Sequence, residues 1–106
     1  MRLHYALQDG CLRLSLQGEL GHHEAIDLMA QIDAVLEDLL PGAAVLDFSE
    51  LDFMDSSGIA VVVQTARKCA ACGCDFSLEH LPKQAQKVLC TAGMDRLVRI
   101  RQEDFA

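Results

Sequence analysis

The sequence predicts an α/β fold with a mixed, mainly parallel sheet and interspersed helices. Three observations lead to this prediction. Short segments with apolar residues at every second position indicate strands, and longer segments with apolar residues every three or four positions indicate helices. The two kinds of segment alternate along the chain, which is typical of parallel strands joined by helices. The 106 residues, 51% of them hydrophobic, suffice for one core, so we expect a single domain over residues 1–106.

The first part of the chain predicts a hairpin followed by an amphipathic helix. Apolar residues alternate with polar or small ones over residues 3–7 and again over 12–16, and the Asp-Gly pair at 9–10 is a favoured two-residue turn. From His22 the apolar positions change to helical spacing, with acidic residues on the opposite side. The Pro-Gly pair at 41–42 ends this helix.

The stretch from Ala43 to Gln64 organises the rest of the chain. An apolar run of strand length leads into a short loop that ends in Asp55-Ser56-Ser57-Gly58, and a second apolar run, long enough for a buried helix, follows. Ser56 or Asp55 would cap this helix by accepting a hydrogen bond from its first turn. Free N–H groups at a helix start also hold phosphate, so the pattern suits either a plain cap or a phosphorylation site.

The remaining elements follow from their boundary residues. The helix from Ser57 is expected to end at Gly73, and a helix that begins at Pro82 is expected to end at Gly93. A short alternating strand lies between them, and a last strand over residues 97–100 precedes a short polar tail. The resulting order is β-β-α-β-α-β-α-β, with the first strand antiparallel to the others.

Charge and composition narrow the classes of function. Nine basic against sixteen acidic side chains, a net charge of -7, argue against nucleic acid as a partner. No segment approaches the roughly 20 apolar residues of a membrane span, and the first residues lack a signal-peptide pattern, so we expect a cytoplasmic protein that does not bind membranes. Five cysteines, an odd number, favour reduced thiols.

Two groups of residues suggest metal or redox chemistry that their positions disfavour. Cys69, Cys72 and Cys74 fall at a helix end, where the dipole disfavours a thiolate, and they lack a second pair of ligands, so we interpret them as small buried side chains. His22 and His23 point apart on a helix, which suits a helix start or a partner-binding surface better than a metal site. No metal, cofactor or enzymatic activity is expected, because no nucleophile-base arrangement or phosphate loop is present.

Three stretches resemble the STAS-domain family of bacterial anti-sigma-factor antagonists. Leu-Asp-Phe-Met-Asp-Ser-Ser-Gly-Ile-Ala-Val at 51–61 is similar to the phosphorylation-site segment of that family. Gly-Glu-Leu-Gly-His-His-Glu-Ala at 18–25 resembles the segment after its second strand, and Thr-Ala-Gly-Met at 91–94 matches its end pattern. The resemblance covers nearly the whole chain and implies a STAS-like fold.

The resemblance also implies a phosphorylation-controlled protein-binding switch. In the family, the unphosphorylated antagonist binds an anti-sigma factor that is also a serine kinase, and this frees a sigma factor. The kinase then phosphorylates the antagonist, and a serine phosphatase restores it. Carried over, Ser56 is the phospho-acceptor of a monomer or weak dimer. The residues expected to bind the partner are Glu19, Gly21, His22, Asp55, Ser57, Gly58 and Ile59.

Two further expectations concern the switch itself. A phosphoryl group on Ser56 would meet free amides of the helix start and leave the fold unchanged, whereas a partner packed there would meet bulk and charge beside Asp55. Gly21 stands where the family often has Asp, which weakens or redirects partner binding.

The chief alternative is a STAS regulatory or scaffold subunit of a transporter or signalling complex that is not phosphorylated. The third possibility is a thioredoxin-like redox enzyme. A measured thiol pKa distinguishes it from the other two, since an unshifted pKa above neutrality would exclude redox activity.

Overall fold

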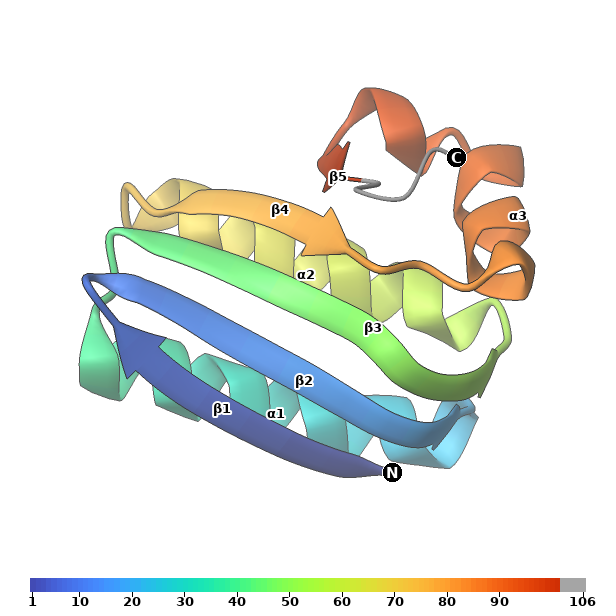
Figure 1. The fold of residues 1–106 in the computed structure, drawn as a ribbon, viewed down its shortest axis with the longest axis horizontal. Helices are drawn as coiled ribbons and strands as arrows, with labels where there is room; N and C mark the ends of the chain where they lie inside the picture. The colour runs from blue at the N-terminus through green and yellow to red at the C-terminus, as the bar shows by residue number, and fades with distance from the viewer. Residues whose placement is uncertain (102–106) are drawn as a thin grey trace.

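A computed structural model describes residues 1–101 of the chain, and the predicted order of strands and helices is confirmed (Figure 1). The family-like α/β architecture follows from that order, with one additional 3₁₀ turn near the end. The elements are β1 (Arg2–Gln8), β2 (Cys11–Leu20), α1 (His22–Leu39), β3 (Ala43–Met54), α2 (Ser57–Ala71), β4 (Asp75–Glu79), α3 (Lys83–Thr91), η1 (Met94–Arg96) and β5 (Arg99–Arg101).

The five strands form one sheet in the order β1-β2-β3-β4-β5. β1 is antiparallel to β2, and each following pair of neighbours is parallel, as the pattern predicts. Asp9 and Gly10 both have positive φ, 54° and 78°, which is the type I′ geometry that suits a two-residue hairpin. The parallel strands therefore end at a common edge, where the loops after β2 and β3 meet.

Helices α1 and α2 lie side by side behind the sheet in Figure 1, whereas α3 lies at the end where β3 leaves it. The helix-facing residues of β2 and β3 form the core with the buried stripe of α1 and the inner side of α2. In Figure 1 no described helix covers the opposite, viewer-facing side of β1–β4. The largest fully buried side chains are Phe48, Leu12, Leu14, Leu16, Leu20, Leu28, Ile32, Leu46, Met54, Leu78, Leu89 and Val61.

The predicted position of the last strand is wrong by two residues at its start. Residues 97–100 were expected to form it, but Leu97 is 75% exposed and the strand spans Arg99–Arg101. Gly93 adopts a left-handed conformation, and Met94 then turns into the core as the first residue of η1. The turn η1 ends at Arg96 and Leu97 caps it, so Leu97 is not part of β5. The predicted polar tail lies outside the described residues.

Candidate functional site

The loops after β2 and β3 bring the predicted site residues together at one edge of the sheet. Leu20 pairs with Met54 at the ends of these strands, and the backbone N–H of Asp55 donates to the carbonyl oxygen of Leu20 at 3.2 Å. The end of β2, which contains Glu19, and the start of α1 therefore lie beside the loop that leads into α2. Two segments separated by more than thirty residues contribute to one surface.

The cap of α2 comes from Asp55, not from Ser56. The Oδ1 atom of Asp55 accepts a hydrogen bond from the N–H of Ser57 at 2.8 Å. Ser56 precedes the first helical residue, but its side chain makes no capping hydrogen bond, and the residue is exposed. Because a neighbouring carboxylate performs the structural task, the Ser56 hydroxyl is accessible at the start of the helix.

Three of the amides expected to meet a phosphoryl group at this helix start already have acceptors within the protein. The N–H of Ser57 donates to the Asp55 carboxylate, and the N–H of Gly58 donates to the Asp55 carbonyl oxygen at 3.0 Å. The N–H of Ile59 donates to the Ser56 carbonyl oxygen at 3.1 Å. These first-turn donors already have acceptors, because the loop closes on itself before the helix proper begins. A phosphoryl group here needs another counter-charge.

A groove of about 410 Å³ runs from the start of α2 to the last turns of α3. Its walls are mainly apolar, and Ser56 lies at one side while Lys87 brings a single positive charge to the lining. Sequence reasoning missed the contribution of α3, although Lys87 and Thr91 stand four residues apart on one helix face, a spacing that could have indicated it. The lining residues are Ser56, Ile59, Lys87, Val88, Thr91 and Ala92.

Gln84 of α3 holds the end of β3 beside this groove. The backbone N–H of Met54 donates to Gln84 Oε1 at 3.0 Å, and Gln84 Nε2 donates to the carbonyl oxygen of Met54 at 2.7 Å. The amide side chain thus replaces a neighbouring strand for the last residue of β3. No local pattern predicts this contact, because the two residues are thirty positions apart.

Gly58 has a packing role that its sequence context did not reveal. A Cβ atom at this position would lie 2.3 Å from both Cγ and Sδ of Met54, whose side chain is fully buried. Gly58 is itself buried. Only a glycine allows the first turn of α2 to approach the end of β3 so closely. Its predicted role in partner binding would therefore be indirect, through the shape of the loop.

Gly21 lies between two carboxylates at the start of α1. Its backbone N–H donates to Oε1 of Glu24 at 3.0 Å. A Cβ atom on Gly21 would be 2.9 Å from that oxygen and 3.7 Å from Oδ2 of Asp55. An aspartate here, as is common in the family, would add a third carboxylate to this cluster. Of the other predicted residues, Glu19 and His22 are exposed, whereas Ser57 and Ile59 are half-buried.

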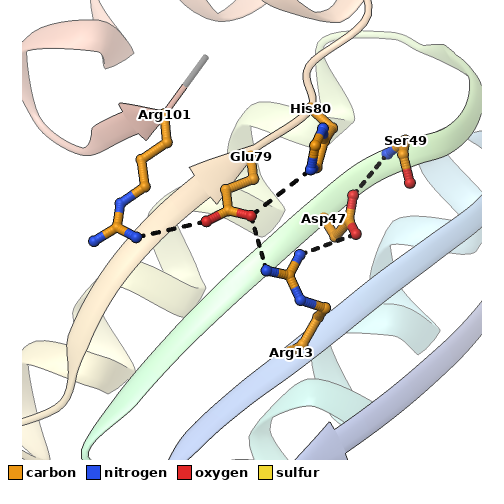
Figure 2. Close-up of polar contacts among 6 residues, drawn as sticks. All are labelled: Arg13, Asp47, Ser49, Glu79, His80 and Arg101. Atoms are coloured by element: carbon orange, nitrogen blue, oxygen red, sulfur yellow. Dashed lines mark hydrogen bonds and ion pairs between the residues drawn. The ribbon is translucent and has the colours of Figure 1, made fainter. Parts of the chain in front are cut away.

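The helix-free face of the sheet carries a charge network that the sequence did not indicate (Figure 2). Arg13 donates from Nη1 to Asp47 Oδ2 at 3.0 Å and from Nη2 to Glu79 Oε1 at 2.8 Å. Asp47 is 9% and Glu79 only 3% exposed. The outer contacts of the network are Ser49 N–H to Asp47 Oδ1 at 3.0 Å, Arg101 to Glu79 Oε2 at 3.6 Å, and His80 Nε2 to Glu79 Oε1 at 3.8 Å.

The protonation of Asp47 reflects this network. Burial raises the pKa of its carboxyl group, but hydrogen bonds from Ser49 and the guanidinium of Arg13 oppose burial and leave the pKa below its usual range. The carboxylate form is therefore the one that the fold stabilises. Asp47 and Glu79 stand opposite each other on neighbouring strands, so Arg13 separates two like charges.

The cysteines differ in exposure. Cys69 and Cys74 are buried, as predicted, but Cys72 is exposed, so the prediction of three buried side chains is wrong for Cys72. Burial raises the pKa of the Cys69 thiol to about 12, which makes it unreactive at neutral pH. Within residues 1–101, no group of three or more His, Cys, Asp or Glu side chains is placed to hold a metal ion. No helix in that part of the chain is long and apolar enough to cross a membrane.

A comparison with known protein families covers almost all of the chain. Residues 3–99 match the sequence profile of the family described as "Mlab, STAS domain". The chain belongs to the STAS domain family. The match includes both loops of the site edge as well as α3, so the resemblance stated from the sequence is confirmed. The groove beside Ser56 is accordingly a feature of a STAS domain.

Solved structures confirm the STAS fold. The unphosphorylated form of SpoIIAA, an anti-sigma factor antagonist from Bacillus, is 23% identical with a TM-score of 0.80, over 97% of this chain and 90% of that one. An anti-sigma factor antagonist from Mycobacterium paratuberculosis is 24% identical with a TM-score of 0.84, over 93% and 83%. A sulfate transporter family protein from Wolinella succinogenes is 13% identical with a TM-score of 0.74, over 94% and 82%. At these identities the likeness concerns the fold.

Proposed function

We propose that this STAS domain is an anti-sigma-factor antagonist whose binding to a partner is controlled by phosphorylation of Ser56. The observation that carries the proposal is the exposed Ser56 hydroxyl at the side of an apolar groove, relieved of capping by Asp55. SpoIIAA, which shares the fold, has been solved in unphosphorylated and phosphorylated forms. The partner in this proposal is a cytoplasmic anti-sigma factor with serine kinase activity, and a serine phosphatase reverses the modification.

When Ser56 is unphosphorylated, the surface around the groove suits a protein partner. Ile59 and Val88 offer apolar contacts in the groove, and the end of β2 and the start of α1 offer the exposed side chains of Glu19 and His22. A partner that fills the groove with an apolar side chain would bury the Ser56 hydroxyl at the margin of the contact, where a small polar group is tolerated. Binding in this state requires no change in the fold.

Phosphorylation would change the charge of that margin. Ser56 Oγ attacks the γ-phosphorus of ATP, the bond to the β-phosphate oxygen breaks, ADP leaves, and the hydroxyl proton passes to the kinase. The product carries about -1.5 to -2 charges next to Asp55. Because the amides of the helix start already have acceptors, Lys87 across the groove is the counter-charge we propose. A partner would then have to desolvate the phosphate and displace Lys87 from it.

The test is phosphorylation by the candidate partners. The protein is incubated with ATP and each serine-kinase-like anti-sigma factor of its source, its intact mass and modified site are determined, and a pull-down measures binding to each. We expect one phosphate on Ser56 and loss of binding to the same kinase. Ser15→Ala is the matched control for Ser56→Ala, because it removes a serine hydroxyl on the helix-free face of β2, away from the groove, and should leave labelling intact. Labelling of Ser56→Ala at the wild-type level would refute the assignment.

The second candidate is a STAS subunit of a transporter or signalling complex that acts without phosphorylation. The Wolinella protein, of the sulfate transporter family, shares the fold and favours this alternative. Gly21, which stands where the family resemblance implies an aspartate, favours it as well. Absence of both phosphate and binding with every candidate kinase would select it.

A further inference from the structure

β1 is an exposed edge strand whose only Lys, Arg, Asp or Glu residue is Arg2, at its first position. It covers seven residues and pairs with β2 along its whole length without a register shift. Edge strands of soluble proteins are commonly interrupted by proline, lysine or a bulge, and β1 has none of these. Tyr5 is 55% and Leu7 46% exposed on the side of the sheet that faces the helices. This apolar strip and its free backbone groups need a partner.

The geometry of the hairpin determines which backbone groups are free. The type I′ turn is closed by the pair Gln8 and Cys11, whose backbones bond to each other. In an antiparallel ladder such pairs alternate with pairs that do not bond, so His4 and Ala6 also bond to β2. The N–H and C=O groups of the intervening residues Leu3, Tyr5 and Leu7 consequently point away from β2, toward the open edge.

We propose that β1 pairs antiparallel with β1 of a second copy of this chain, about a twofold axis at Tyr5. In this register Tyr5 lies opposite Tyr5 of the partner subunit, and Leu3 lies opposite Leu7 of the partner subunit. The outward backbone groups meet as bonded pairs, and the two sheets become one continuous sheet. The contact is isologous, so it closes at two copies, and β5 forms each outer edge of the combined sheet.

The register is self-complementary on both sides of the sheet. On the helix side, apolar residues meet only apolar residues. On the helix-free side, Arg2 faces Gln8 of the partner subunit and approaches the neighbouring carboxylate of the partner subunit's Asp9, while His4 faces the small Ala6 of the partner subunit. β1 contains no acidic residue although the chain has a net charge of -7, so no like-charged acids oppose.

A hollow on each copy receives the larger side chains of the other. It measures about 390 Å³ and lies on the helix-free side at the closed end of the hairpin. In the proposed register, Arg2 and His4 of the partner subunit stand above its rim. Its lining residues are Ala6, Gln8, Asp9, Cys11 and Arg13. One short strand on each copy makes a small interface, so we expect a weak dimer with a dissociation constant of about 1 µM to 1 mM.

The test is sedimentation equilibrium of the full chain across protein concentrations from about 10 µM to 1 mM. We expect the wild-type mass to rise from 11.6 kDa toward twice that value. Tyr5→Lys and Tyr5→Glu should each remain monomeric, because the twofold axis places like charges opposite each other. An equimolar mixture of the two variants should form a heterodimer, since only this register places residue 5 opposite residue 5.

The control is Ile26→Lys, which adds the same charge at an apolar position of α1 that is 59% exposed, and it should dimerise like the wild type. Circular dichroism of each variant establishes that it is folded. A wild type that stays monomeric at 1 mM, or a mixture that does not associate, overturns the proposal. The outcome is independent of the phosphorylation proposal, because Ser56→Asp should leave the dimer unchanged.

Discussion

Removing the positive charge between Asp47 and Glu79 should destabilise the fold strongly. In Arg13→Met the stem is kept, but two mostly buried carboxylates lose their shared partner (Figure 2). Breaking a fully buried ion pair costs about 3–5 kcal/mol. The side chain of Arg13 is 44% exposed and Arg101 remains 3.6 Å from Glu79, so we expect about 2–3 kcal/mol.

Urea denaturation at pH 7 measures this loss, because urea is uncharged and does not screen the carboxylates. A loss of about 2–3 kcal/mol corresponds to a decrease in Tm of about 10–20 °C for a domain of this size. Arg101→Met is the matched control. Its side chain is 52% exposed and its contact is longer, so it should cost less than about 1 kcal/mol.

The pH dependence separates charge from packing. The folded pKa of Asp47 is lowered, so its contribution is complete above the unfolded pKa and is lost as pH falls through the folded value. The wild type should therefore lose stability in acid, whereas Arg13→Met should lose less, because protonation of Asp47 removes a charge that the variant leaves uncompensated. An equal cost of Arg13→Met at pH 7 and at about pH 3, or a cost no larger than that of Arg101→Met, would refute this reasoning.

Three other predictions concern the site edge. Gly58→Ala should cost about 1–3 kcal/mol in thermal unfolding, despite the better helix propensity of alanine, and Met54→Ala in the same chain should relieve part of the clash. Gln84→Leu leaves the backbone of Met54 without its partners and should cost about 1–3 kcal/mol, whereas the neighbouring exposed Lys83→Leu should stay within about 0.5 kcal/mol by urea denaturation. Lys87→Gln should reduce the loss of partner binding that phosphorylation causes, with both states measured by calorimetry, because the variant lacks the cation that a partner must displace; a loss equal to that of the wild type would contradict the role of Lys87 as counter-charge.

The elements of this fold were predictable because their signals are local. The alternation over residues 3–7 and 12–16, with Asp9-Gly10 between them, predicts the hairpin, and both turn residues have the expected positive φ. The helical stripe from His22 likewise matches the buried side of α1. Each of these patterns repeats within a few residues, so tertiary contacts were not needed to recognise it.

Long-range polar contacts were not predictable, because no local pattern in the sequence identifies their two partners. Alternation in β4 assigns Glu79 to a wet face, yet it is buried because Arg13, sixty-six residues away, covers it. Local patterns treat a charged residue as solvated unless its partner is known. The groove was missed in the same way, since the position of α3 alone brings Lys87 into one lining with Ser56 and Gln84 into contact with Met54.

The residues around Ser56 are of two kinds: those whose side chain or size the fold requires, and those without a structural contact. Asp55 caps α2, and Gly58 makes room for Met54, so substitution of either changes the loop itself. Ser56 makes no capping contact, and Lys87 is exposed on the groove. A modification that changes binding without unfolding the domain must act on residues such as Ser56 and Lys87, which the fold does not require. Charge added at Ser56 can therefore alter the groove while the cap, the close packing and the Gln84 contact stay in place.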